Sequence, residues 1–167
     1  MNRILQTLLL TVAGLVAVSS FVLAADEPAK TEGPKWGVDY KAALAESKKT
    51  GKPILIDFTG SDWCGYCVKQ HAEVFDKAEW QKWASENVIL LTADYPRKNT
   101  QSEEVKKQNA ELKAKFSPRG FPTMLFVDAE GAELGRWAGY GPGSGVEAWI
   151  KKATPFVEKA KGDIKQK

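Results

Sequence analysis

The stretch that decides the fold runs from Ile54 to Cys67 and reads ILIDFTGSDWCGYC. Its apolar beginning, Ile54–Phe58, follows a Gly-Lys-Pro breaker and therefore predicts a short buried strand. It ends with Cys64 and Cys67, which are the only two cysteines of the chain. A disulfide across so short a loop removes little entropy from the unfolded chain, so the pair is expected to serve redox chemistry rather than architecture.

Helical and strand-like segments alternate on both sides of this stretch. The spacing of apolar residues predicts a helix from Trp36 to Ser47 before it. A second helix is expected from about Trp63, with Asp62 or Ser61 as its N-cap. The later segments are predicted as a short helix after Asp76, a strand over 88–93, a helix over 101–116, strands over 124–127 and 133–138, and a helix from Ser144. This order predicts an α/β fold in which a mixed central sheet carries helices on both faces.

The N-terminal segment differs in kind from the rest of the chain. Arg3 precedes an apolar stretch, Ile4–Leu23, and small residues lead up to Ala24. This pattern predicts a secretory signal peptide over 1–24 that is cleaved near Ala24, which would place the mature protein in the periplasm or outside the cell. An uncleaved anchor is the alternative, because the apolar stretch is long enough to cross a bilayer.

The charge and composition of the chain bear on its partners and on its domain organisation. Lys and Arg number 24 against 21 Asp and Glu, so the net charge of +3 gives no reason to expect a nucleic-acid partner. No segment looks like a dimerisation domain, and a monomer is expected. The predicted organisation is a signal peptide over 1–24, a flexible leader over 25–35, a folded domain over 36–153 and a charged C-terminal tail over 154–167.

Three motifs together resemble the thioredoxin superfamily: Leu55–Phe58, Trp63–Cys67 and Gly120–Thr123. A C-x-x-C pair beside a strand–helix–strand pattern is a specific signal, and the Gly-Phe-Pro-Thr element strengthens it. The amino-acid sequences of residues 58–64 and Val74–Asp76 are most similar to those of secreted domains that resemble the C-terminal domain of the bacterial thiol:disulfide interchange reductase. The resemblance implies a thioredoxin fold.

The resemblance and the chemistry of thiols together indicate the site residues. Cys64 is expected to be the nucleophile, because a helix N-terminus favours its thiolate, and Cys67 is expected to resolve the mixed disulfide. Asp57, within an apolar run, is expected to accept a proton from Cys67; an aspartate turned outward at a strand end is the alternative. The residues expected to bind substrate are Trp63, Gly65, Tyr66, Phe121, Pro122, which the resemblance implies to be a cis-proline, and Gly139.

Two departures from the thioredoxin pattern bear on function. Gly65–Tyr66 replaces thioredoxin's Gly-Pro dipeptide and resembles that of bacterial disulfide isomerases. Leu90 is predicted to stand where thioredoxins carry a lysine in the second central strand. Two residues and a few hydrogen bonds can shift a reduction potential widely, so the sequence leaves the reductase, isomerase and oxidase directions open.

The predicted function is that of a thiol:disulfide oxidoreductase acting on protein disulfides outside the cytoplasm, with reductase as the preferred direction. Its partners would be protein thiols or disulfides and a membrane or soluble redox donor; no cofactor and no metal are expected. One alternative is a copper or zinc carrier that uses Cys64, Cys67 and His71, although His71 is more simply a solvated helix residue. Another is a peptide-binding domain whose cysteine pair is idle.

Overall fold

A computed structural model of the protein describes residues 33–164, with side chains described up to Gly162. The predicted signal peptide, and the predicted leader up to residue 32, lie outside the described residues. Residues 33–36 have no regular secondary structure. None of the helices within 33–164 combines the length and the apolar character that a bilayer crossing requires.

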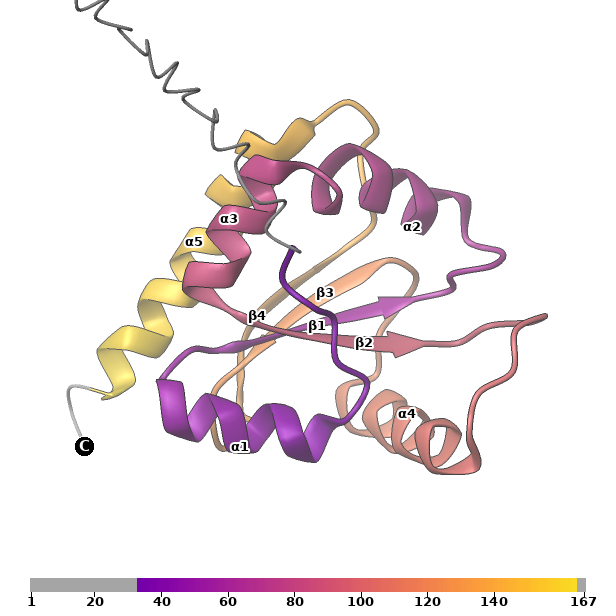
Figure 1. The fold of residues 1–167 in the computed structure, drawn as a ribbon, viewed down its shortest axis with the longest axis horizontal. Coiled ribbons are helices and arrows are strands. Elements are labelled where there is room, and N and C mark those ends of the chain that lie inside the picture. Colours follow the sequence, from indigo (N-terminus) through magenta and orange to yellow (C-terminus); the bar gives the residue numbers. More distant parts are fainter. Residues whose placement is uncertain (1–32, 165–167) are drawn as a thin grey trace, which may run out of the picture. The chain divides into compact units, whose positions relative to one another are not determined.

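The centre of the fold is a four-stranded sheet (Figure 1). Its strands are β1 (Ile54–Thr59), β2 (Ile89–Asp94), β3 (Thr123–Val127) and β4 (Glu133–Ala138), and their order across the sheet is β2-β1-β3-β4. The β1–β2 pair is parallel, whereas β1–β3 and β3–β4 are antiparallel. The predicted mixed sheet is therefore confirmed.

Helices cover both faces of this sheet, as predicted. They are α1 (Tyr40–Thr50), α2 (Gly65–Gln70), a π-helix η1 (His71–Phe75), α3 (Ala78–Asn87), α4 (Glu103–Phe116) and α5 (Gly145–Ile164). Figure 1 shows α1 and α4 on one side of the strands, and α2, α3 and α5 on the other.

Alternation along β1 divides the core into two layers. Ile54, Ile56 and Phe58 pack in the cluster that includes residues of α1 and α4, whereas Leu55 packs in the cluster built on η1, α3 and α5. Successive side chains of a strand point to opposite faces, so Asp57 lies on the same face as Leu55. The one carboxylate of β1 is thus directed toward the layer that contains α2 and η1.

The first helix begins later than the sequence pattern predicts. Asp39 is the N-cap of α1, and its Oδ1 accepts the N–H of Ala42 at 2.9 Å. Trp36 lies before this cap in an extended segment, where Gly37 forms a parallel bridge with Leu91. An N-cap residue has extended rather than helical backbone, which is why the helix cannot include Trp36.

The predicted C-terminal boundary at residue 153 is wrong. Helix α5 continues through Pro155 to Ile164, and Val157 and Ala160 are buried in the same core cluster as Trp149. Apolar residues at helical spacing continue beyond position 154, and their burial outweighs the effect of the single proline and the surrounding lysines. The folded domain therefore includes most of the segment that was expected to be a charged tail.

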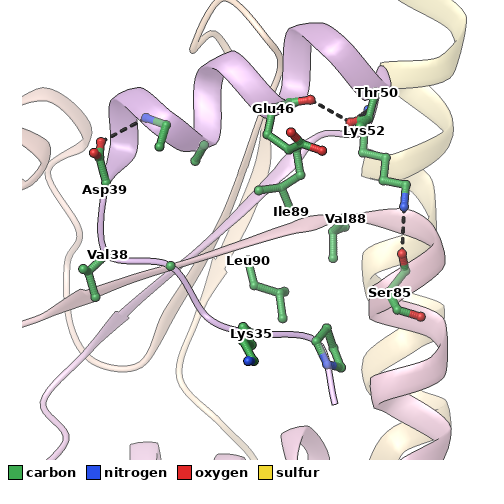
Figure 2. Close-up of a pocket in the computed structure, with 14 residues that line it drawn as sticks. Lys35, Val38, Asp39, Glu46, Thr50, Lys52, Ser85, Val88, Ile89 and Leu90 are labelled. Atoms are coloured by element: carbon green, nitrogen blue, oxygen red, sulfur yellow. Dashed lines mark hydrogen bonds between the residues drawn. The ribbon is translucent and has the colours of Figure 1, made fainter. Parts of the chain in front are cut away.

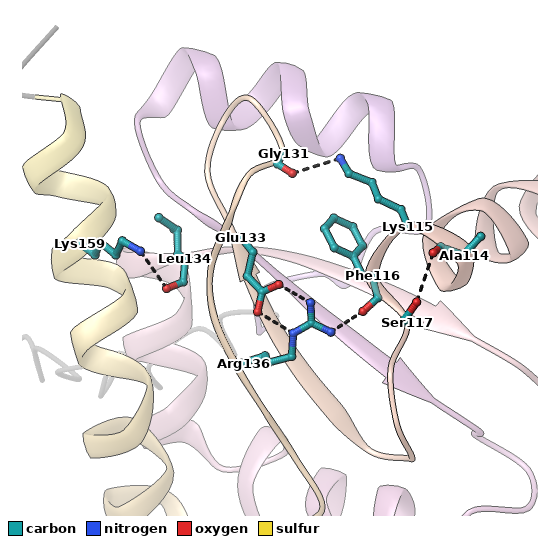
Figure 3. Close-up of polar contacts among 9 residues, drawn as sticks. All are labelled: Ala114, Lys115, Phe116, Ser117, Gly131, Glu133, Leu134, Arg136 and Lys159. Atoms are coloured by element: carbon teal, nitrogen blue, oxygen red, sulfur yellow. Dashed lines mark hydrogen bonds and ion pairs between the residues drawn. The ribbon is translucent and has the colours of Figure 1, made fainter.

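The C-terminal end of α4 is tied to the edge strand β4 by Arg136 (Figure 3). Its Nε donates to Oε1 of Glu133 at 2.6 Å, and its terminal nitrogens contact Oε2 of Glu133 and the carbonyl oxygen of Phe116. Nearby, Nζ of Lys115 donates to the carbonyl of Gly131 at 3.1 Å. These contacts fix the point where the chain leaves α4 for the segment that leads to Phe121.

Candidate active site

The two cysteines are joined in a disulfide at the N-terminus of α2. Their Cα atoms are 5.2 Å apart, Cys64 is the N-cap of the helix, and the Cys67 N–H points at the Cys64 sulfur at 3.3 Å. Cys67 is 1% exposed and Cys64 is 6% exposed. The helix therefore directs its positive end and the Cys67 N–H, which has no partner within the helix, at the outer sulfur, and either feature would stabilise a thiolate there.

The predicted caps of this helix have a different role. The carboxylate of Asp62 accepts the backbone N–H groups of residues 97–99 at 2.7–2.9 Å, and these hydrogen bonds, with that of Arg97 the largest, lower the pKa of Asp62. Ser61 donates its N–H and its hydroxyl to Asp94, at 2.9 and 2.6 Å. Both side chains are thus used to hold the active-site loop against the loop that follows β2.

Trp63 connects the disulfide loop to two other segments. Its Nε1–H donates to the carbonyl of Tyr95 at 2.8 Å, and the guanidinium of Arg97 lies 4.1 Å from the centre of its ring. Phe121 meets the ring edge-on, with centroids 5.6 Å apart. The residue before Cys64 is therefore held in a cluster of aromatic rings with a cation above it.

The segment at Pro122 carries the features that the resemblance implied. The Phe121–Pro122 peptide bond is cis, and the Pro122 carbonyl accepts the N–H of Gly139 at 2.7 Å. Gly139 has φ 80°, a backbone conformation that side chains other than glycine rarely adopt. The structure thus brings Pro122 and Gly139 into direct contact, and it places Phe121 against Trp63.

An apolar surface lies beside the cysteines on α2. Tyr66 is 57% exposed and Val68 is 53% exposed, which makes them two of the three exposed large apolar side chains within 33–164. Gly65 is also exposed, and a methyl group built on it would meet no other atom within 4 Å. This surface is open to a partner molecule.

Asp57 is buried on the face that carries α2 and η1. Its Oδ2 lies 3.0 Å from Nε2 of His71, while Oδ1 is buried without a hydrogen-bond partner. Burial raises the pKa of Asp57; the hydrogen bond and charge of His71 act against this rise, and the charge of Asp94 adds to it. Asp57 is therefore not an outward-facing strand residue, and the expectation that His71 is merely solvated is wrong.

The register of the parallel β1–β2 pair determines which residue of β2 lies beside Asp57. The register pairs Asp57 with Thr92, whereas Leu90 pairs with Leu55 and is buried in the core. In a parallel pair, partners in register present their side chains to the same face. Thr92, rather than Leu90, therefore stands beside the buried carboxylate.

A second carboxylate, Glu73 of η1, fastens the loop between β4 and α5. Its Oε2 accepts the hydroxyl of Tyr140 at 2.5 Å and the N–H of Gly143 at 2.9 Å. These hydrogen bonds, with that of Gly143 the larger, lower the pKa of Glu73. The loop that begins at Gly139 is in this way connected to the helix that follows the cysteines.

The arrangement gives no support to a metal carrier. Within the described residues, no three His, Cys, Asp or Glu side chains are grouped so that they could hold an ion. The third ligand that such a carrier would need, His71, is bonded to Asp57 instead. A cavity of about 500 Å³ lies between α1 and the start of β2, and neither cysteine lines it. Figure 2 shows its lining, where Lys52 donates to the carbonyl of Ser85.

Comparison with known proteins settles the family. A family model described as a thioredoxin-like domain matches residues 40–154. The chain belongs to the thioredoxin-like family. The disulfide bond reductase DsbH of Chlamydia pneumoniae is 42% identical over 113 residues, which cover 68% of this chain and 67% of DsbH. A solved structure of a DsbH oxidoreductase matches with a TM-score of 0.72 at 36% identity, over 81% of this chain and 92% of that chain.

The predicted branch of the family is also confirmed. The thiol:disulfide interchange protein DsbD of Yersinia pestis is 33% identical over 94 residues, which cover 56% of this chain but only 14% of DsbD. The predicted thioredoxin fold is confirmed, and the chain is a thioredoxin-like thiol:disulfide oxidoreductase with a C-x-x-C pair.

Proposed function

We propose that this protein reduces disulfides of other proteins, with Cys64 as the nucleophile and Cys67 as the resolving thiol. The observation that carries the assignment of Cys64 as the nucleophile is its position as N-cap of α2, where the Cys67 N–H faces its sulfur. The direction is supported by the name of the relative DsbH, a disulfide bond reductase.

The reaction would transfer two electrons from the enzyme dithiol to the substrate disulfide. The Cys64 thiolate attacks one substrate sulfur, forms a mixed disulfide and releases the other sulfur as a thiolate. Cys67 then loses its proton and attacks the Cys64 sulfur. The Cys64–Cys67 bond forms, the bond to substrate breaks, and the second substrate sulfur leaves as a thiolate that takes a proton from water.

Asp57 would accept the proton that Cys67 loses. Its carboxylate is buried and lies on the face directed toward the helix that carries Cys67. A buried carboxylate whose pKa is raised by desolvation is a better proton acceptor than an exposed one. Asp57 can fill this role without the help of a second acidic group between β1 and α2.

Substrate would bind across the surface beside Cys64. The exposed Tyr66 and the open space at Gly65 favour contact with an extended segment of another protein, and the Trp63–Phe121 pair provides an aromatic wall. An extended peptide beside Pro122 and Gly139 could add main-chain hydrogen bonds of the kind used in strand addition.

The compartment and the partners follow from the predicted signal peptide. A segment with a positive start, an apolar centre and small residues before Ala24 favours a periplasmic or secreted protein. There the reduced state must be renewed, so a membrane or soluble redox donor is required after each turnover. The protein would act as a monomer and without a cofactor.

The decisive experiment measures reduction of insulin by the dithiol form, together with the reduction potential of the pair by equilibration with glutathione. Wild-type protein should reduce insulin, Cys64→Ser should abolish the reaction, and Cys67→Ser should accumulate the mixed disulfide. A potential near that of thioredoxin, about −270 mV, supports a reductase. A value near that of DsbA, about −120 mV, would contradict the proposed direction.

A further inference from the structure

The contact between His71 and Asp57 joins the protein surface to the buried carboxylate. Asp57 is 1% exposed, whereas the His71 side chain is 36% exposed, and the nitrogen–oxygen distance is 3.0 Å. His71 lies where the helix changes from α to π, and its backbone N–H bonds to the carbonyls of Cys67 and Val68. The imidazole is thus one helical turn from the resolving cysteine.

Cys67 and His71 also line the same cavity. It measures about 320 Å³ and lies between α2, η1 and the ends of β1 and β2. Thr92, the register partner of Asp57, contributes to its wall. The buried hydroxyl of Thr59, which has no hydrogen-bond partner, contributes a further polar atom. Cys67, His71 and the two threonines, Thr59 and Thr92, therefore line one cavity, whose walls are otherwise largely apolar.

A buried proton acceptor such as Asp57 needs a path by which its proton can reach solvent. A proton that moves from Cys67 to Asp57 must leave before the next turnover, but a carboxyl group that is almost fully buried has no direct route to bulk water. The one side chain within 33–164 that forms a hydrogen bond with Asp57 is His71. Imidazole carries two nitrogens, so it can take a proton on one and release a proton from the other.

We propose that His71 is a proton relay that connects Asp57 to solvent during the resolving step. The proposal rests on the proposed function, because it concerns the proton released when Cys67 attacks the mixed disulfide. Asp57 takes that proton, passes it to Nε2 of His71, and Nδ1 of the imidazolium releases a proton to water. The two electrons pass from the enzyme to the substrate sulfur as before. His71 ends the step neutral, with its proton on Nε2 instead of Nδ1, and exchange with water returns the proton to Nδ1 before the next turnover.

Other charged and aromatic groups surround the pair, but among the described residues the hydrogen bond to Asp57 comes from His71. Asp76, at the end of η1, lines the same cavity and is exposed. From β2, Asp94 acts on Asp57 only through its charge, and its own oxygens accept hydrogen bonds from Ser61. From η1 and the segment before α1, the rings of Phe75 and Trp36 pack against the imidazole at centroid distances of 4.7 and 5.9 Å. These rings hold the imidazole in place but cannot carry a proton.

The test isolates the resolving step in the full chain. The reduced protein is mixed with oxidised glutathione at concentrations high enough that the rate no longer depends on glutathione, and the plateau rate is followed from mildly acidic to mildly alkaline pH. His71→Gln keeps an amide that can donate to Asp57 but cannot relay a proton. Lys69→Gln is the matched control, because Lys69 is exposed near the end of α2, two residues before His71.

In His71→Gln we expect the plateau rate to fall by about tenfold or more relative to Lys69→Gln. This is less than the roughly 10²–10⁴-fold typical of an acid–base group, because Asp57 itself remains in place. In His71→Ala, imidazole added to the solution should raise the rate in proportion to its concentration, which a purely structural role would not produce. A plateau rate for His71→Gln that matches Lys69→Gln at every pH would overturn the relay. Alkylation of Cys64 should be equally fast in all variants, so a failure of the disulfide chemistry itself would be recognised separately.

Discussion

Reduction of the Cys64–Cys67 bond perturbs the folded protein in a way that bears directly on its redox direction. The disulfide closes a loop of only four residues, from one cysteine to the other. In the chain-entropy description, a loop of this size stabilises the folded state by about 1.9 kcal/mol, against about 4.7 kcal/mol for a loop of one hundred residues. Reduction should therefore lower the free energy of unfolding by at most about 2 kcal/mol.

A thiolate at the start of α2 has the opposite effect on stability: it raises the free energy of unfolding of the reduced form. Every interaction that favours ionised Cys64 stabilises the reduced form, and such interactions make a strong oxidant. The potentials of thioredoxin and DsbA differ by about 150 mV, which corresponds to about 7 kcal/mol for two electrons. The loop contribution is small on this scale. The sign of the difference in unfolding free energy between the oxidised and reduced forms therefore indicates whether the protein is a reductant like thioredoxin or an oxidant like DsbA.

The assay is urea unfolding of the oxidised and the reduced protein at one pH and temperature. For a reductase we expect the oxidised form to unfold at the higher urea concentration, with similar slopes for the two forms. The double variant Cys64→Ser, Cys67→Ser is the control, because the reductant should leave its midpoint unchanged. A reduced form that is more stable than the oxidised form would refute the reductase assignment.

Three further predictions concern the parts that surround the site. Glu73→Ala removes the acceptor for Tyr140 and Gly143, so the amides of the loop after Gly139 should exchange faster with solvent. Because these hydrogen bonds lower the pKa of Glu73, the wild-type loop keeps them at neutral pH. The loop should loosen only as the pH falls below the ordinary carboxyl pKa of 4.5. Gly135→Ala should cost about 2 kcal/mol in urea unfolding, since its new methyl group would lie 2.1 Å from the ring of Phe156, while Gly141→Ala, which meets no atom within 4 Å, should leave stability nearly unchanged. Arg136→Met leaves the carbonyl at the end of α4 without its cation and should cost about 1 kcal/mol, whereas Met at the exposed Arg119 should have little effect; equal midpoints for the two variants would contradict the role of Arg136.

The sequence predicted the sheet and the position of the cysteines because the signals are local. The apolar run before Cys64 can only be buried, and two cysteines in one turn need no knowledge of distant segments. The resemblance added Pro122 and Gly139, which lie far from the cysteines in sequence. These elements fix the fold and the reacting atoms.

The parts that could not be predicted depend on register and on loops. Asp57 and His71 meet only because β1 turns its odd-numbered side chains toward α2 and because His71 follows Cys67 by one helical turn. The spacing from Cys67 to His71 is the one signal that the sequence offers for this contact, and the same spacing fits a metal ligand or a solvated helix residue equally well. The sequence does not show whether Thr92 or Leu90 lies beside Asp57, because that depends on how β1 pairs with β2. A slip of two residues in this pairing leaves the pattern of buried and exposed positions unchanged.

The attachment of the loop at 97–99 has a consequence for how selectivity can evolve. Asp62 holds this loop through backbone N–H groups, which every residue except proline possesses. The side chains at these positions are exposed, and that of Arg97 stands over Trp63, next to the reacting sulfur. Exchanging them can therefore re-tune which client proteins are preferred while the anchoring of the loop, and the redox chemistry beneath it, stays as it is.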